Sequence, residues 1–238
     1  MFRRLLRWAA LTIAAFVGIV AALRIVDPPL TPLMLRNAAA YGVHKRWAYL
    51  GDVGEPLVRA VVAAEDARFF EHHGVDWEAI RRARDYNARH GDEPRRGGST
   101  ITMQCARNVF LWQGKSYLRK GLEVGIASLL EVLWGKRRIL EVYLNVIEWG
   151  PGLYGAQAAA ERYFRTTAAA LGPHEAALLA AALPNPLRWS PAAPSAYLRA
   201  RAQLIERHAA HLRLPNSIQA GTAPDGSGMT VRPMPPRP

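Results

Sequence analysis

The feature that most constrains this chain is an uninterrupted run of sixteen uncharged residues near its N-terminus, from Trp8 to Leu23. At about 1.5 Å per residue, sixteen helical residues are short for a hydrocarbon layer of about 30 Å. The arginines that flank the run can snorkel towards the headgroups, which extends the usable span from about Leu5 to Val26. We therefore predict that the chain begins with one transmembrane helix.

A cleaved signal peptide is the alternative interpretation, because its apolar region has a similar length. No clean small-x-small cleavage site precedes Arg24, which favours an uncleaved anchor. Arg3, Arg4 and Arg7 stand before the run, whereas only Arg24 follows it directly. This asymmetry predicts a single pass through the cytoplasmic (inner) membrane, with the N-terminus cytoplasmic and the rest of the chain periplasmic or extracellular.

The chain also carries a formal net charge of +12, which indicates an anionic partner. Nucleic acid, a phospholipid surface and a phosphorylated substrate all fit that description. Export from the cytoplasm disfavours nucleic acid and leaves the membrane and a phosphorylated substrate. The single cysteine, Cys105, excludes an internal disulfide framework.

The remaining sequence predicts one mostly α domain. From Glu55 to about Ser190 it reads as consecutive helices, and no useful alternating strand pattern occurs. One helix is expected from about Ser116 to Trp134, where Gly135 ends or bends it, and a buried helix rich in alanine and leucine is expected from His174 to Leu183. Prolines at 28, 29 and 32 predict a stiff exit from the membrane. The expected organisation is an anchor over 1–27, a membrane-proximal linker over 28–54, a helical domain over 55–214 and a disordered tail over 215–238 rich in Pro, Gly and Ser.

Glu65 is the first candidate catalytic residue. It follows Val58 and Val61 by seven and four residues, so it shares their apolar helix face. Such a position disfavours the charged carboxylate, which raises the pKa and makes a stronger base. Position alone favours the other interpretation, a partly buried glutamate paired with an arginine such as Arg68.

Glu123 is a second candidate of a different kind. It follows Arg119 by four residues on a predicted helix, and that spacing is typical of a surface ion pair rather than of a catalyst. His72 and His73 predict no metal site, because no second His or Cys cluster stands at ligand spacing.

The loop from Arg95 to Gln104 combines arginines, glycines and hydroxyl residues. Glycines allow close approach of a ligand, and hydroxyls can bond sugar or phosphate oxygens, although ordinary loops share this composition. Residues 81–138 hold thirteen Lys and Arg against five Asp and Glu. A solvated basic face is the default interpretation, but beside a membrane anchor such charge suits anionic headgroups or a pyrophosphate.

Five stretches in order resemble the motifs of the biosynthetic peptidoglycan glycosyltransferases, a domain found alone or at the front of bifunctional penicillin-binding proteins. The stretches are E-D-A-R-F-F-E-H-H-G-V-D from Glu65, G-G-S-T-I-T-M-Q-C-A-R-N from Gly97, R-K-G-L-E from Arg119 with K-R-R-I-L-E-V-Y-L-N from Lys136, G-L-Y-G-A-Q-A-A-A-E-R-Y-F from Gly152 and H-E-A-A-L-L-A-A-A-L-P-N-P from His174. They cover nearly everything between Glu65 and Pro186, and the first two are specific. The resemblance implies a single lysozyme-like helical domain.

The resemblance also implies a reaction. The growing lipid-linked glycan strand would be transferred, with inversion and release of polyprenyl pyrophosphate, onto the 4-hydroxyl of lipid II, a disaccharide-peptide on polyprenyl pyrophosphate. Glu65 would be the catalytic base, and Glu123 a second catalytic carboxylate that positions cations or a metal. The substrate-binding residues would be Asp66, Arg68, Ser99, Thr100, Gln104, Arg107, Asn108, Lys115, Arg119 and Lys120. No tightly bound cofactor is expected, although a divalent cation (Mg or Mn) is compatible with the reaction. Cell-wall synthesis or division proteins are compatible protein partners.

Two departures from the family pattern stand in the second motif. Met103 replaces the first of two glutamines, which puts one polar contact in doubt, and Arg107 replaces a common lysine. No Ser is followed three residues later by Lys and no K-T-G occurs, so the resemblance implies a monofunctional enzyme without transpeptidase activity.

Two rival functions remain at this point. A lysozyme-like glycan-cleaving enzyme would need no pyrophosphate site, so the basic segment argues against it. A lipid-binding scaffold would leave the motif at Glu65 unexplained.

Overall fold

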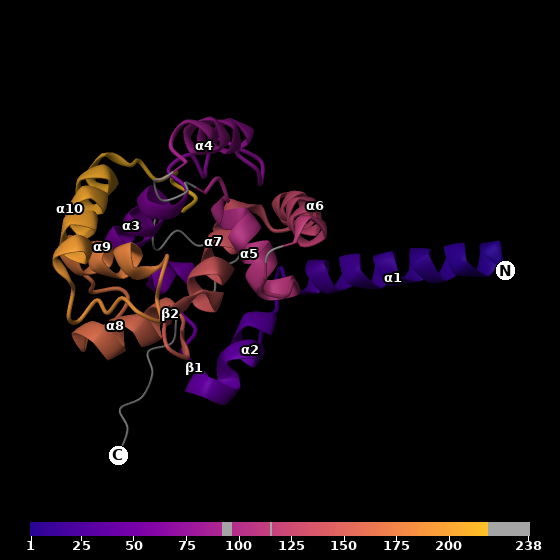
Figure 1. The fold of residues 1–238 in the computed structure, drawn as a ribbon. Helices are drawn as coiled ribbons and strands as arrows, with labels where there is room; N and C mark the ends of the chain where they lie inside the picture. The colour runs from indigo at the N-terminus through magenta and orange to yellow at the C-terminus, as the bar shows by residue number, and fades with distance from the viewer. Residues whose placement is uncertain (92–96, 115, 219–238) are drawn as a thin grey trace, which may run out of the picture.

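The computed structural model describes residues 1–91, 97–114 and 116–218, and over these the chain is mostly helical (Figure 1). The helices are α1 (Phe2–Ala22), α2 (Pro32–Tyr41), α3 (Glu55–Glu65), α4 (Trp77–Arg89), α5 (Ile101–Phe110), α6 (Tyr117–Leu133), α7 (Gly135–Val146), α8 (Ala156–Phe164), α9 (Pro173–Ala182) and α10 (Ala196–His211), with a 3-10 turn at Leu50–Asp52. The predicted fold class, a mostly α domain with an N-terminal apolar helix, is confirmed.

Side-chain caps explain where several helices begin. The Asp76 carboxylate accepts a hydrogen bond from the Ala79 amide at 2.8 Å at the start of α4. The Thr100 hydroxyl accepts one from the Met103 amide at 3.1 Å at the start of α5. These oxygens satisfy amides that have no partner within the helix. Gly135, with φ of 71°, separates α6 from α7, as the sequence predicts.

Two packing groups form the core. α5 packs against both α6 and α7, while α3 packs against α9 and α10. α9 is the most enclosed helix of the second group, because every side chain from Ala176 to Ala182 is buried. The buried helix predicted over 174–183 is therefore confirmed. Glu65 ends α3 and faces α5 across the junction of the two groups.

A small sheet escaped prediction. β1 (His44–Lys45) pairs in parallel with β3 (Leu153–Tyr154), and β3 pairs antiparallel with β2 (Glu148–Gly150). Strands of two or three residues are too short to produce a readable alternation of polar and apolar residues. The sheet joins the segment after α2 to the loop between α7 and α8.

The predicted linker over 28–54 is wrong, because most of it belongs to the folded domain. Pro32 begins α2 rather than ending a helix, with Thr31 as its cap. Met34, Leu50 and Val53 are all buried in the core. The prolines were interpreted as a stiff spacer, whereas proline is equally suited to the first turn of a helix.

The predicted tail also begins too early. Ile218 is 2% exposed and lies in the core, and the Arg137 guanidinium donates to the Ser217 carbonyl at 3.0 Å. The rest of the predicted disordered tail, 219–238, lies outside the described residues.

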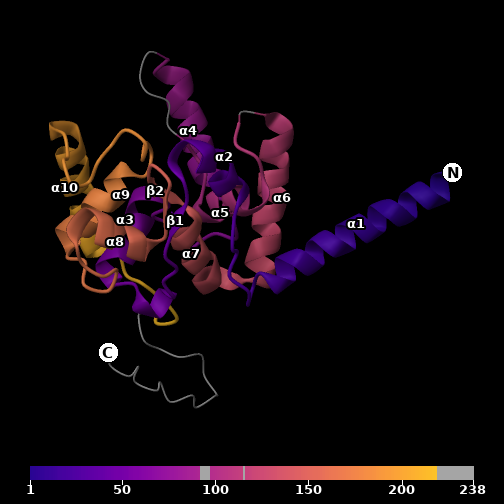
Figure 2. The same cartoon turned by 90° about the horizontal axis from the view of Figure 1, so that it is seen from below.

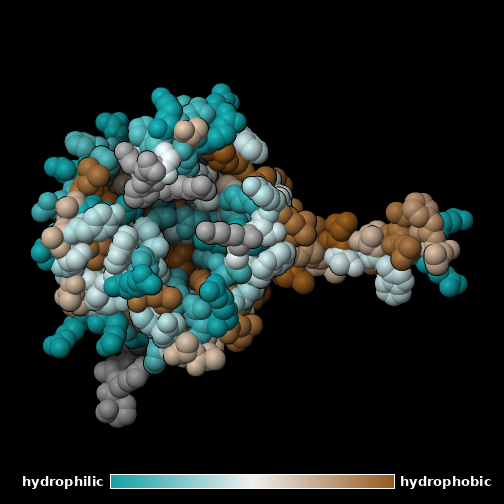
Figure 3. Space-filling view, in the orientation of Figure 1, coloured by the Kyte–Doolittle hydropathy of each residue, from teal (hydrophilic) through white to brown (hydrophobic). Residues whose placement is uncertain are grey.

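α1 is the one helix among the described residues that is long and apolar enough to cross a membrane. It projects away from the domain in both ribbon views (Figures 1 and 2). Hydrophobic residues cover most of its surface and continue onto the adjoining edge of the domain (Figure 3). The helix ends at Ala22, short of the predicted limit at Val26, and its last turn is docked: Val20 is buried and its carbonyl accepts a hydrogen bond from Trp134 Nε1 at 2.7 Å.

Candidate active site

The Glu65 carboxylate is held from one side by a short chain of hydrogen bonds. Gln104 Nε2, on α5, donates to Glu65 Oε2 at 2.8 Å. Tyr143, on α7, donates its hydroxyl to Gln104 Oε1 at 3.1 Å. The tyrosine fixes the orientation of the amide, so that its NH₂ group and not its carbonyl faces the carboxylate. Glu65 itself remains partly exposed.

This environment makes Glu65 a stronger base than an ordinary glutamate. Burial raises the pKa of the Glu65 carboxyl, and the Gln104 hydrogen bond and the charges of Arg201 and Arg107 offset part of that rise. Burial and the nearby Glu65 charge raise the pKa of the Tyr143 hydroxyl well above its usual value, so Tyr143 remains a hydrogen-bond donor. The prediction that an apolar setting raises the pKa of Glu65 is confirmed in direction.

The second carboxylate, Glu123, is fully buried on α6 and pairs with two cations. Arg119 Nη1 donates to Glu123 Oε2, and Lys120 Nζ donates to Glu123 Oε1 at 2.8 Å. The three residues align because they stand three and four positions apart on one helix. The predicted pairing with Arg119 is confirmed, but its predicted place at the surface is wrong.

Lys120 connects this carboxylate to the glycine-rich loop. Its ammonium donates a second hydrogen bond, to Ser99 Oγ, at 2.9 Å. Arg119 is in turn fixed by a 2.8 Å hydrogen bond from its Nε to the Gly114 carbonyl. Glu123 therefore holds two cations in place while it cancels only one of their charges, and the Lys120 side chain is still 39% exposed.

A cavity of about 370 Å³ opens beside the Glu65 group, with Gln104, Arg107 and Asn108 of α5 along one side. Arg107 Nε is buried without a hydrogen-bond partner. An unsatisfied buried donor of a charged group is costly, so it identifies a position where an anionic ligand atom would be stabilised. Asn108 accepts a weak hydrogen bond from Gln113 at 3.4 Å and also lines the cavity.

Two predicted substrate-binding residues instead have partners inside the fold. Asp66 accepts hydrogen bonds from the Ile101 amide and from His72 Nε2, each at 3.0 Å, and so links the end of α3 to the start of α5. Thr100 caps α5 and donates its hydroxyl to the Gly74 carbonyl at 2.5 Å. Both are buried, and their hydrogen bonds hold the start of α5, the helix that carries Gln104, against neighbouring segments.

Arg68 is not brought to the site. Its guanidinium pairs with Glu71 at 2.8 Å and with Glu78. The alternative in which Arg68 neutralises Glu65 is therefore wrong as well, because these acidic neighbours already bind it. Lys115, another predicted substrate-binding residue, lies outside the described residues.

Met103 accounts for one departure from the family pattern. Its side chain is fully buried in the hydrophobic core and does not line the cavity beside Glu65. A glutamine there would need hydrogen-bond partners among apolar side chains. The polar contact that was in doubt at this position has no access to the candidate site.

The described side chains form no ready-made cage of ligands for a divalent cation. Within the described ranges no three His, Cys, Asp or Glu side chains group as metal ligands. The buried Glu123 carboxylate accepts hydrogen bonds from Arg119 and Lys120 on both of its oxygens. Its arrangement is suited to holding positive side chains and not a metal ion.

Sequence reasoning missed several residues of the site. Tyr143 falls within the third motif without being singled out, although a tyrosine on a buried helix face signals a hydroxyl that needs a partner. Arg201, on α10, gave no signal because its charge reaches Glu65 only through the packing of α10 on α3. Asn37 and Glu148 also line the cavity and are joined at 2.8 Å, across more than a hundred residues of sequence.

Residues 34–210 match the protein-family profile described as Transglycosylase. Over 219 residues the chain is 51% identical to the "Biosynthetic peptidoglycan transglycosylase" of Rhodospirillum centenum, covering 90% of this chain and 94% of the relative. Over 230 residues it is 47% identical to the protein of the same description from Xanthomonas campestris pv. campestris, covering 92% and 93%. The similarly described protein of Caulobacter vibrioides is 47% identical over 209 residues, covering 85% and 90%.

Proposed function

Because this chain belongs to the biosynthetic peptidoglycan transglycosylase family, we propose that it extends a lipid-linked glycan strand by one lipid II unit at a time, with Glu65 as base. The chain is a monofunctional peptidoglycan glycosyltransferase, since the alignments cover more than 90% of relatives that carry this single description. The glycan-cleaving alternative is not supported, because these relatives are biosynthetic.

Glu65 takes the proton from the 4-hydroxyl of the acceptor sugar in the proposed reaction. The freed oxygen forms a bond to the anomeric carbon of the donor strand, while the bond from that carbon to the pyrophosphate breaks and the leaving group takes the electron pair. Attack from the opposite face inverts the configuration, so no covalent enzyme intermediate is needed. The raised pKa of Glu65 supports this role, because it makes the carboxylate a stronger base.

Arg107, Arg119 and Lys120 are proposed to stabilise the pyrophosphate. Pyrophosphate is a good leaving group that needs neutralised charge more than a proton. Arg107 has an unsatisfied buried Nε, and Lys120 has a partly exposed ammonium beside Ser99. No step is routed through a metal ion, and both oxygens of Glu123 accept hydrogen bonds from basic side chains.

Glu123 is proposed to act on the cations and not on the sugar. Both of its oxygens accept hydrogen bonds from basic side chains, and the residue is fully buried. Because both oxygens are occupied, the carboxylate can hold Arg119 and Lys120 at fixed positions. Of the two roles that the resemblance allows for Glu123, we therefore propose the positioning of cations and not the binding of a metal.

The apolar helix α1 supports a single membrane anchor. We propose that its N-terminus is cytoplasmic and that the domain lies on the outer side, because Arg3, Arg4 and Arg7 precede the apolar run. This orientation places the domain where lipid II would be consumed. Contacts with other cell-wall synthesis or division proteins remain an expectation.

The Glu65–Gln104–Tyr143 chain is the observation that supports this function most strongly. Purified full-length protein should convert labelled lipid II into a polymer that lysozyme digests, and should leave a preformed strand uncut. Cleavage of the strand without polymer formation would contradict the proposal.

A further inference from the structure

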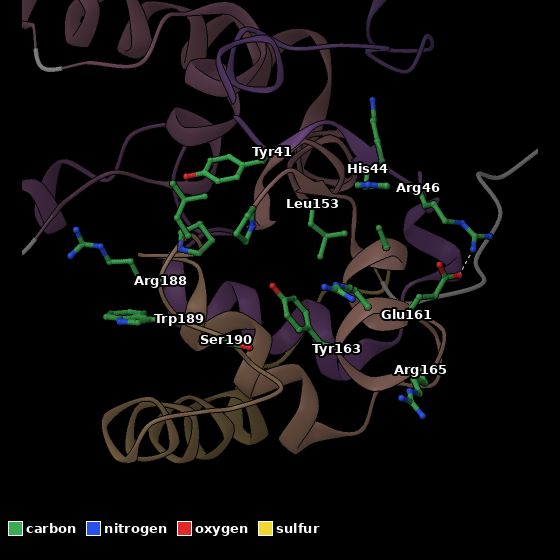
Figure 4. Close-up of a pocket in the computed structure, with 16 residues that line it drawn as sticks. Tyr41, His44, Arg46, Leu153, Glu161, Tyr163, Arg165, Arg188, Trp189 and Ser190 are labelled. Atoms are coloured by element: carbon green, nitrogen blue, oxygen red, sulfur yellow. Dashed lines mark hydrogen bonds and ion pairs between the residues drawn. The ribbon is translucent and has the colours of Figure 1, made fainter. Parts of the chain in front are cut away.

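A second cavity, larger than the one beside Glu65, lies elsewhere on the domain. It measures about 1070 Å³ and lies between β1 and β3, α8 and the segment that follows α9 (Figure 4). Nothing in the proposed reaction uses this cavity, which we call the α8 cavity.

The α8 cavity continues from the cavity beside the candidate active site. Pro186 and Leu187 line both of them. The smaller cavity includes Gln104, which bonds directly to Glu65. A polymer that is held at Glu65 could therefore extend past Pro186 and Leu187 into the larger space.

Positive charge dominates the lining of the α8 cavity, and part of that charge is uncommitted. Five Lys and Arg side chains line it against one carboxylate, Glu161, which pairs with Arg46. The Lys45 ammonium donates to backbone carbonyls. Across residues 1–91, 97–114 and 116–218, no hydrogen bond or ion pair engages the exposed guanidinium groups of Arg162, Arg165 and Arg188.

These cations surround the cavity and do not converge on one point. Arg188 and Trp189 lie on one side, Arg165 and the Arg46–Glu161 pair lie on the other, and Tyr163 stands between them (Figure 4). A single phosphate would be bound by converging donors. Separated cations are suited to an extended ligand that carries several separate anionic groups.

The backbone at Arg165 adds an independent observation. Arg165 ends α8 in the left-handed conformation, with φ of 56°, and it is the only non-glycine residue of the described chain with positive φ. Helices that end in this way usually place glycine there, because a Cβ atom is disfavoured. A strained arginine without a partner in the fold indicates a role for its side chain.

Aromatic side chains complete the lining. Trp189 and Tyr163 are partly exposed, and Tyr41 is 45% exposed. Their flat apolar faces can cover the carbon–hydrogen faces of sugar rings, while arginines bind the charged groups. α8 lies on the side of the domain away from α1 in both ribbon views, so a lipid headgroup next to the anchor would not reach this cavity (Figures 1 and 2).

We propose that the α8 cavity binds the glycan strand away from its lipid end, with Arg162, Arg165 and Arg188 binding carboxylates of the peptides that the strand carries. The inference rests on the proposed function, which supplies a disaccharide-peptide polymer as the ligand. The chemistry is that of an anionic peptide on a sugar backbone, and the role is to hold the strand while the next unit is added.

Binding of a soluble fragment to the full-length protein in detergent tests the proposal without turnover. The probe is a lipid-free glycan of a few disaccharide units with its peptides attached, compared by calorimetry with the same glycan after removal of the peptides. Arg165→Gly removes the charge while it relieves the backbone strain, and Arg188→Gln removes a second charge. Arg207→Gln, on the exposed face of α10, is the matched control.

We expect each cavity variant to weaken binding of the peptide-bearing glycan about two- to fivefold, as for an exposed ion pair, and the control to leave it unchanged. Arg165→Gly should melt no lower than the wild type, which separates lost binding from lost folding. Wild-type affinity in both cavity variants, equal binding of the peptide-free glycan, or no binding at all would each overturn the proposal. A wild-type protein that binds the glycan but makes no polymer would refute the proposed function and leave this inference standing.

Discussion

Gln104 Nε2 lies 2.8 Å from Glu65 Oε2, and this hydrogen bond joins the two halves of the helical core at the candidate base. Glu65 ends α3, which packs with α9 and α10, whereas Gln104 belongs to α5, which packs with α6 and α7. A shift of α3 relative to α5 would change this hydrogen bond and therefore the pKa of Glu65.

Glu65→Gln should lower the rate of polymerisation by about 10²–10⁴-fold, because the amide cannot accept a proton. Binding of lipid II should survive, and the melting temperature should not fall, since the change removes a partly buried charge whose ionisation opposes folding. Glu71→Gln, an exposed glutamate of the same motif, is the control. Near-normal turnover by Glu65→Gln, together with an inert Glu123→Gln variant, would transfer the role of base to Glu123.

Gln104→Leu should shift the acidic limb of the kcat/KM profile to higher pH. The Gln104 hydrogen bond stabilises charged Glu65, so its loss raises the pKa of Glu65 beyond the rise that burial already causes. The base works when it is ionised, and activity is therefore lost sooner as the pH falls. Gln203→Leu, at an exposed position of α10, should leave the profile in place. An unmoved acidic limb in Gln104→Leu would mean that another group controls it.

Glu123→Gln should affect both stability and donor binding. It leaves Arg119 and Lys120 without their buried counter-ion, and breaking such a pair typically costs about 3–5 kcal/mol of unfolding free energy. Polymerisation should remain measurable at high substrate concentration, with a raised KM. Chemical denaturation gives the first quantity, and steady-state rates with lipid II give the second. A variant with wild-type stability would contradict the buried pairing.

Arg107→Glu should abolish polymerisation while the protein stays folded, because a carboxylate there would repel the pyrophosphate. Arg207→Glu, away from either cavity, should keep wild-type turnover. Circular dichroism checks the fold, and product gels check the rate. If Arg107→Glu polymerised lipid II normally, Arg107 would be removed from the proposed site.

A reporter enzyme that works only outside the cytoplasm should be active when it is fused after residue 238. The expectation rests on the three arginines before the apolar run, which favour a cytoplasmic N-terminus, and on α1 as the proposed single membrane span. The junction follows the full chain because Ile218 is buried and a cut before it would disturb the core. Activity of a cytoplasmic reporter at the same junction would reverse the proposed orientation.

Helical periodicity was sufficient to predict most of the helices, because helices of ten or more residues repeat an apolar face often enough to be recognised. The break at Gly135 and the buried helix near Leu178 follow directly from local composition. The strand at His44–Lys45 does not, because its partner at Leu153–Tyr154 lies more than a hundred residues away. Long-range pairing of this kind leaves no local pattern.

The site shows the same division between local and distant information. The spacing of Arg119 and Glu123 predicts their ion pair, but burial depends on what packs over α6, so the pair was wrongly placed at the surface. Asp66 stands beside Glu65 in sequence and was assigned to the substrate, whereas its partners are the start of α5 and His72. A motif identifies which residues matter together, and it does not separate those that touch a ligand from those that hold the others.

The hydrogen bond from Trp134 Nε1 to the Val20 carbonyl has a mechanical consequence. It acts with the Phe16–Phe110 ring contact and with the bonds from Arg138 to the carbonyls of Leu23 and Val26. α1 is therefore fixed rigidly to the domain and is not joined to it by a flexible linker. The orientation of the domain relative to its proposed membrane anchor is restricted for the same reason. With α1 as its membrane anchor, an enzyme held in this way would meet a lipid-linked substrate by lateral diffusion in the plane of the bilayer.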